Sequence, residues 1–209
     1  MGKKEKRKNR EIPCNYLASE KSERATTLFN AVKPHLISLC EQGANRDSDF
    51  AVAKFTMLDI TCGTSPLSSH ITNAFPDVSI TGFDMNEKAI LKCKSKFPNH
   101  SWTNSLSNQF IVDRCYDFVI HIGVSSLRYN VAEIHDRLME NRSGRPKLIL
   151  LEWGDNREGT CDTKQTFDTI KESYTKSGFS IIDGGEFELK NPTNIPYPTR
   201  RYEIFKGDF

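Results

Sequence analysis

The sequence of 209 residues lacks several features that would have placed it in other classes. It has no run of about 18 apolar residues, so we expect no membrane-spanning helix. No apolar segment follows the basic N-terminus, which argues against a secretory signal. The six cysteines are dispersed and include no C-x-x-C pair, so neither a zinc site nor a disulfide framework is indicated. We therefore expect a cytoplasmic protein with reduced thiols and no bound metal.

Two nucleotide-binding signatures are also missing. No P-loop of the form G-x-x-x-x-G-K-S/T occurs, so nucleotide hydrolysis has no support. The dinucleotide pattern G-x-G-x-x-G fails at Thr61 and Pro66, on either side of Gly63. A nicotinamide-dependent dehydrogenase is therefore disfavoured.

Positive charge is concentrated at the N-terminus. The net charge is +2, although the first eleven residues alone carry six Lys or Arg and two Glu. We interpret residues 1–12 as a disordered basic tail, which is common for a terminus that nothing holds. The alternative is that this tail anchors the protein to RNA through phosphate contacts.

Residues 13–50 are expected to form N-terminal helices that cover a ligand site. Apolar side chains recur there at spacings of three and four, which places them on one helical face. They are Leu28, Val32, Leu36 and Leu39. Pro34 lies inside this pattern and predicts a division into two helices.

From residue 51 to residue 209 the pattern alternates between strands and helices. Strands are expected at 55–60, 78–83, 118–122, 147–152, 179–182 and 201–205, and helices at 67–75, 87–97, 131–141 and 163–177. Repeated strand–helix–strand units predict an α/β domain with a parallel sheet and helices on both faces. Gly184 and Gly185 predict a turn before the last strand. No helix separates the last two strands, so the final strand is free to be antiparallel.

The carboxyl ends of the first two strands indicate a ligand site. The first strand ends near Asp59 and leads into the turn Thr61–Pro66, and the second ends at Asp84. Ligands of doubly wound sheets bind outside the carboxyl ends of the strands. Asp84 follows Gly63 by 21 residues, where an acid that holds a ribose is expected.

The stretch from Met57 to Ile90 resembles the class I S-adenosylmethionine-dependent methyltransferases. Their first motif is D-x-G-x-G-x-G, which here has Thr61 and Ser65 at two of the three glycine positions. The resemblance implies a doubly wound, mostly parallel seven-stranded sheet with an antiparallel C-terminal strand, and S-adenosylmethionine as cofactor. It assigns cofactor binding to Asp59, Thr61, Cys62, Gly63, Thr64, Ser65, Asp84, Met85, Asn104 and His121. We interpret Cys62 as a small packed residue rather than a nucleophile.

The resemblance also implies roles for later segments. The third strand falls at Ser101–Ser105, where Asn104 would stand in for an acid near the adenine and Trp102 would pack on it. The loop after the fourth strand places His121, Gly123, Val124 and Ser125 near the sulfonium. The hydroxyls of Ser65 and Thr64 in the first turn are candidates to bind the methionine carboxylate.

Three residues are candidates for a role in catalysis. His121 is expected beside the substrate opening, where an imidazole would act as a general base near neutral pH. Tyr129 is a candidate on the substrate side. Glu152 follows a buried strand and is expected in the pocket, together with Trp153. Arg200 and Arg201 would bind an acidic substrate, or would instead be the solvated charges of an edge strand.

Methyl transfer needs alignment of acceptor and methyl group more than it needs a catalytic triad. The Asn/Asp-Pro-Pro-aromatic motif, which in the resembled superfamily marks methylation of exocyclic amines in DNA and of glutamine, is missing, since the corresponding segment begins at His121. The Pro-Cys pair of cytosine-C5 enzymes is also missing from its expected place. By elimination we expect transfer to oxygen or nitrogen of a small molecule. The alternatives are an RNA methyltransferase and a non-catalytic protein that binds the cofactor.

Overall fold

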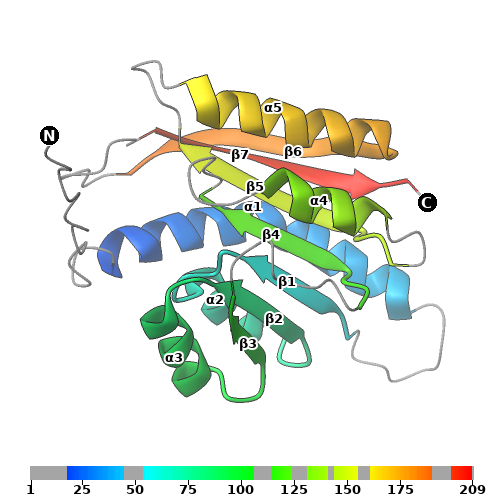
Figure 1. Ribbon diagram of the computed structural model, residues 1–209. Helices are drawn as coiled ribbons and strands as arrows, with labels where there is room; N and C mark the ends of the chain where they lie inside the picture. Colours follow the sequence, from blue (N-terminus) through cyan, green and yellow to red (C-terminus); the bar gives the residue numbers. More distant parts are fainter. Residues whose placement is uncertain are drawn as a thin grey trace, which may run out of the picture.

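The computed structural model describes residues 18–44, 54–105, 114–123, 131–140, 144–154, 161–189 and 199–208. Helices and strands alternate along most of them (Figure 1). The elements are α1 (Ala18–Ala44), β1 (Thr56–Ile60), α2 (Pro66–Ala74), β2 (Ser79–Asp84), α3 (Glu87–Lys96), β3 (Ser101–Asn104), β4 (Phe118–Ile122), α4 (Val131–Glu140), β5 (Leu148–Gly154), α5 (Cys161–Lys176), β6 (Phe179–Glu188) and β7 (Thr199–Gly207). The predicted basic tail, residues 1–12, lies outside this description.

The strands form one seven-stranded sheet in the order β3-β2-β1-β4-β5-β7-β6. Neighbours from β3 to β5 pair in parallel, whereas β7 runs antiparallel to both β5 and β6. This confirms the predicted fold class, including the antiparallel final strand. The order reverses direction between β1 and β4, and that switch point is where a doubly wound sheet binds its ligand.

Each face of the sheet is covered by its own helices. Residues of α1, α2 and α3 share one buried cluster with side chains such as Met57 of β1, and residues of α4 and α5 share a second with Leu58. Figure 1 shows this layering. Neighbouring residues of a strand point to opposite faces, and that alternation divides the core into two layers. None of the helices in the described ranges has the length and apolarity to cross a membrane.

Pro34 does not divide the N-terminal helix, so that prediction was wrong. α1 continues through it over 27 residues. Leu28, Val32 and Leu36 are fully buried on both sides of the proline, whereas Pro34 and Asn30 are exposed. Asn30 is four residues earlier, so its carbonyl loses the usual helical partner but can bond to water. Burial of one continuous apolar face outweighs the lost hydrogen bond.

The prediction of a turn at Gly184 and Gly185 was also wrong. Both glycines lie inside β6, which pairs with β7 over nearly its whole length. A Cβ at Gly184 would lie 3.1 Å from the carbonyl oxygen of Tyr202, and one at Gly185 would lie 3.0 Å from the Tyr202 ring. The two glycines therefore permit a close approach between strands, which is another known reason for glycine in a strand.

Candidate cofactor site

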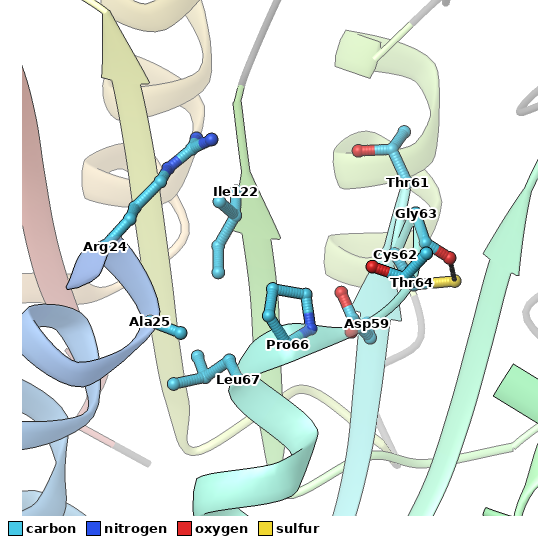
Figure 2. A pocket seen from close by; sticks show the side chains of 10 residues that line it. All are labelled: Arg24, Ala25, Asp59, Thr61, Cys62, Gly63, Thr64, Pro66, Leu67 and Ile122. Atoms are coloured by element: carbon cyan, nitrogen blue, oxygen red, sulfur yellow. Dashed lines mark hydrogen bonds between the residues drawn. The ribbon is translucent and has the colours of Figure 1, made fainter. Parts of the chain in front are cut away.

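The first two strands bring the predicted ligand residues to one edge of the sheet. β1 and β2 pair in parallel, with Asp59 opposite Gly82, so the turn after β1 meets the end of β2. A cavity opens there between this turn and the N-terminal part of α1 (Figure 2). It is lined by Arg24, Ala25, Asp59, Thr61, Cys62, Gly63, Thr64, Pro66, Leu67 and Ile122.

The turn keeps a glycine-like backbone at all three motif positions. Thr61 has φ 54°, Gly63 φ 54° and Ser65 φ 45°. Only glycine adopts this left-handed region without a steric penalty, and a β-branched threonine there is unusual. The backbone of the turn is therefore left-handed at all three motif positions even though two of the glycines are replaced.

Ser65 compensates through its side chain. It is fully buried, and its hydroxyl donates a hydrogen bond to the Asp59 carboxylate and contacts the Ser68 hydroxyl. The hydroxyl makes no cap bond to the helix that follows. The idea that it binds the methionine carboxylate needs correction, because this hydroxyl faces Asp59 inside the protein.

Substitution by glycine is expected to have opposite effects on stability at Thr61 and at Ser65. Thr61→Gly is expected to raise the free energy of unfolding by about 0.5–1 kcal/mol, since relief of strain exceeds the entropy cost of glycine. Ser65→Gly relieves similar strain but leaves the buried Asp59 without a donor, so a net decrease of up to about 2 kcal/mol is expected. Urea titrations measure both. Changes of the same sign would contradict this assignment.

Asp59 is buried beneath the turn. It is 3% exposed. Burial raises its pKa to about 7, partly opposed by the Ser65 hydrogen bond and reinforced by Asp84. Near neutral pH this carboxyl is therefore partly protonated.

The raised pKa has a defined sign for stability. The folded state holds the proton on Asp59 more tightly than the unfolded state, whose ordinary value is 3.8. The resulting stabilisation is complete below that value and is lost as the pH rises through about 7. Asp59→Asn removes this loss, so from pH 4 to 8 its stability relative to wild type should rise by at least about 1 kcal/mol. Urea unfolding across this range measures the difference, and a constant difference would contradict the expectation.

Asp84 joins the turn to the next helix. Its carboxylate accepts hydrogen bonds from the backbone N–H groups of Gly63 (2.8 Å) and Asn86 (2.7 Å). The Asn104 side-chain amide and the Ser105 backbone N–H donate to its carbonyl oxygen, at 3.1 and 3.2 Å. Asp84, the predicted ribose acid, and Asn104, the predicted adenine-side residue, are therefore in direct contact. Cofactor binding by either one stays a prediction.

Met85 and Trp102, two residues expected at the cofactor, differ in exposure. Met85 follows Asp84 directly and is 42% exposed. Trp102 is buried, donates from its indole nitrogen to the Phe97 carbonyl oxygen and lies over Gly82, where a Cβ would come within 2.4 Å of its ring. The expectation that Trp102 packs on the adenine is corrected, because its ring fills the core between β2, β3 and α3.

His121 is not at a substrate opening. It is 1% exposed, and its Nδ1 lies 3.2 Å from Nε2 of His135, whose other nitrogen contacts the Tyr174 hydroxyl. Burial lowers the pKa of His121 to about 3, against a weaker effect of Glu152. The ring therefore stays neutral near pH 7 in a buried network that links β4, α4 and α5. This geometry gives a general-base role no support.

Glu152 lies at the centre of a second cluster rather than open to the pocket. It is fully buried, and both its oxygens accept hydrogen bonds from Arg24 of α1 and Arg200 of β7. The backbone N–H of Gly123 adds a fifth bond at 2.8 Å. Burial alone would raise the pKa of Glu152, but the two guanidinium groups lower it to about 2. Its catalytic role stays a prediction, and the geometry supports an electrostatic one.

The remaining predicted residues either pack in the core or lie outside the described part of the chain. Trp153 is 9% exposed and stacks on Phe167, so it packs in the core. Tyr129, Val124 and Ser125 lie outside the described residues. Arg24 was missed by sequence reasoning. Its partner is 128 residues away, and no local motif links the two.

The chain resembles solved methyltransferases over most of its length. BpumL, a plantazolicin methyltransferase in complex with SAH, has a TM-score of 0.60 at 13% identity, covering 92% of this chain and 90% of BpumL. NodS, an N-methyltransferase from Bradyrhizobium japonicum, has a TM-score of 0.60 at 14% identity, covering 91% and 97%. Precorrin-6y C5,15-methyltransferase from Geobacter metallireducens has 0.56 at 13%, covering 74% and 81%. No protein-family model and no curated protein matches the sequence.

These similarities define the fold. The chain has the class I S-adenosylmethionine-dependent methyltransferase fold, as the motif around Asp59 and Asp84 predicted. Identities of 13–14% do not by themselves define an activity. The activity has to be argued from the site.

Proposed function

We propose that this protein is an S-adenosylmethionine-dependent methyltransferase that acts on oxygen or nitrogen of a small molecule. One observation carries the proposal: the turn after β1 has the backbone of a three-glycine motif and donates from Gly63 to Asp84. Two structural neighbours, BpumL and NodS, were solved with S-adenosylhomocysteine, which supports this choice of cofactor.

The described residues fit such a cofactor. The Asp84 carboxylate lies beside the turn, where it would accept hydrogen bonds from both ribose hydroxyls. The left-handed backbone at Gly63 has open space where a Cβ would point, so a ligand can approach the main chain closely. When bound, S-adenosylmethionine supplies a methyl group on a positively charged sulfur, which is a good leaving group.

The protein would then contribute binding, alignment and exclusion of water. Pro66, Leu67 and Ile122 give the cavity an apolar wall, which limits competing water. Ordering the acceptor in line with the methyl group lowers the entropic part of the barrier. A general base is needed only where the acceptor must first lose a proton, and Tyr129 is the remaining candidate for that role.

Calorimetric titration with S-adenosylmethionine and S-adenosylhomocysteine tests the proposal. We expect micromolar dissociation constants for both, followed by turnover in a screen of small acceptors and then of tRNA. Failure of both ligands to bind at millimolar concentration would refute the methyltransferase assignment. Binding without turnover on any acceptor would favour a non-catalytic cofactor-binding protein.

A further inference from the structure

The cluster around Glu152 carries more positive than negative charge. Two guanidinium groups, those of Arg24 and Arg200, share this single carboxylate. In the part of the chain that the structure describes, no other acidic side chain forms an ion pair with either arginine. If both remain protonated, the cluster holds one surplus positive charge beside the cavity.

The arginines differ in how far a ligand can reach them. The Arg200 side chain is 9% exposed, whereas that of Arg24 is 22% exposed and lines the cavity (Figure 2). Arg24 uses Nε and Nη2 for Glu152, and its Nη1 has no partner among the described residues. A guanidinium fixed in this way presents its remaining N–H donors without further loss of rotamer freedom.

The position of the cluster separates it from the ribose acid. Asp84 ends β2, whereas Glu152 lies in β5 and Gly123 follows β4, on the other side of β1 in the sheet. Neighbouring strands lie about 4.8 Å apart, so β5 is roughly 14 Å from β2. The cluster therefore adjoins the part of the cavity farthest from the predicted ribose position.

We propose that Arg24, held by Glu152 beside Arg200, is a subsite for the carboxylate of the methyl acceptor. A single surplus charge matches a monoanionic carboxylate better than a doubly charged phosphate. The apolar wall formed by Leu67 and Ile122 suits an aromatic or aliphatic body next to that carboxylate. The inference rests on the proposed methyltransferase function and narrows its acceptor class to organic acids.

Benzoate and its neutral counterpart benzamide test the subsite, with S-adenosylhomocysteine present at saturation so that the cofactor position is filled. Calorimetry is expected to show at least tenfold tighter binding of benzoate to the wild type. Arg24→Gln should weaken benzoate at least tenfold and leave benzamide unchanged, and Arg24→Lys should restore part of the difference. Arg137→Gln is the matched control, because Arg137 is a partly exposed arginine of α4 that pairs with Glu133 of the same helix.

Several results would overturn the subsite. They are equal binding of benzoate and benzamide to the wild type, unchanged benzoate binding in Arg24→Gln, and benzoate binding that occurs only when S-adenosylhomocysteine is left out. The last would assign the carboxylate position to the cofactor. If Arg24→Gln does not fold, the wild-type comparison decides. If S-adenosylhomocysteine itself does not bind, the proposed methyltransferase function is refuted. If it binds but benzoate and benzamide bind equally well, only the carboxylate subsite is refuted.

Discussion

Replacing Asp84 by alanine is expected to lower the affinity for S-adenosylmethionine and S-adenosylhomocysteine at least about 100-fold. Each hydrogen bond from a ribose hydroxyl to the carboxylate contributes about 1.5–3 kcal/mol, and about 1.4 kcal/mol corresponds to tenfold in affinity. The substitution also removes the acceptor for the Gly63 N–H, so the turn loses its anchor. Calorimetric titration of both ligands measures the loss.

Two comparisons separate a lost contact from a general effect. Asp77→Ala removes an exposed carboxylate just before β2 and should leave both affinities within about twofold of wild type. Asp84→Asn keeps one oxygen acceptor and should fall between wild type and Asp84→Ala. Wild-type affinity in Asp84→Ala, with the protein folded by circular dichroism, would rule out Asp84 as the ribose ligand.

Replacing Glu152 by alanine is expected to lower the free energy of unfolding by about 3–5 kcal/mol, because it leaves two neighbouring guanidinium groups without a counter-charge. The carboxylate joins α1, β7 and the end of β4 through five hydrogen bonds, so its loss releases all three from one another. Urea unfolding at pH 7 measures the change, and Glu152→Gln, which keeps the shape and one acceptor, provides a milder variant.

Glu186→Ala is the matched control for this effect. Its carboxylate is 47% exposed and pairs with Arg201 on the same strand pair. An exposed pair of this kind contributes at most about 1 kcal/mol. Equal losses in Glu152→Ala and Glu186→Ala at pH 7 would show that burial adds nothing to this cluster.

The stabilisation by Glu152 also depends on pH. Because the folded pKa of Glu152 is about 2, below its ordinary value of 4.5, its stabilisation is present above pH 4.5 and is lost as the pH falls toward 2.

Local pattern was sufficient for most of the elements but not for two details. β4 was predicted with its observed ends, and most other elements agree within a few residues. Pro34 and Gly184 were misjudged because their usual local meaning, a break and a turn, was overridden by contacts with residues distant in sequence. Leu36, beyond the proline, is fully buried and keeps the helix packed against the core. Gly184 and Gly185 of β6 lie so close to Tyr202 of β7 that larger side chains would not fit there.

The candidate site likewise has parts that the sequence predicted and parts that only the structure revealed. The order of strands and turns, with an acid near the end of each of the first two strands, already indicated a class I methyltransferase fold and placed Asp59 and Asp84 at one edge, since parallel strands align their carboxyl ends. The sequence alone thus determined the fold class and the candidate cofactor side. Only tertiary structure decided that His121 faces the core and that Arg24 reaches Glu152. A side chain's face depends on the register of its strand, and an ion pair between residues 24 and 152 depends on how a helix packs across the sheet.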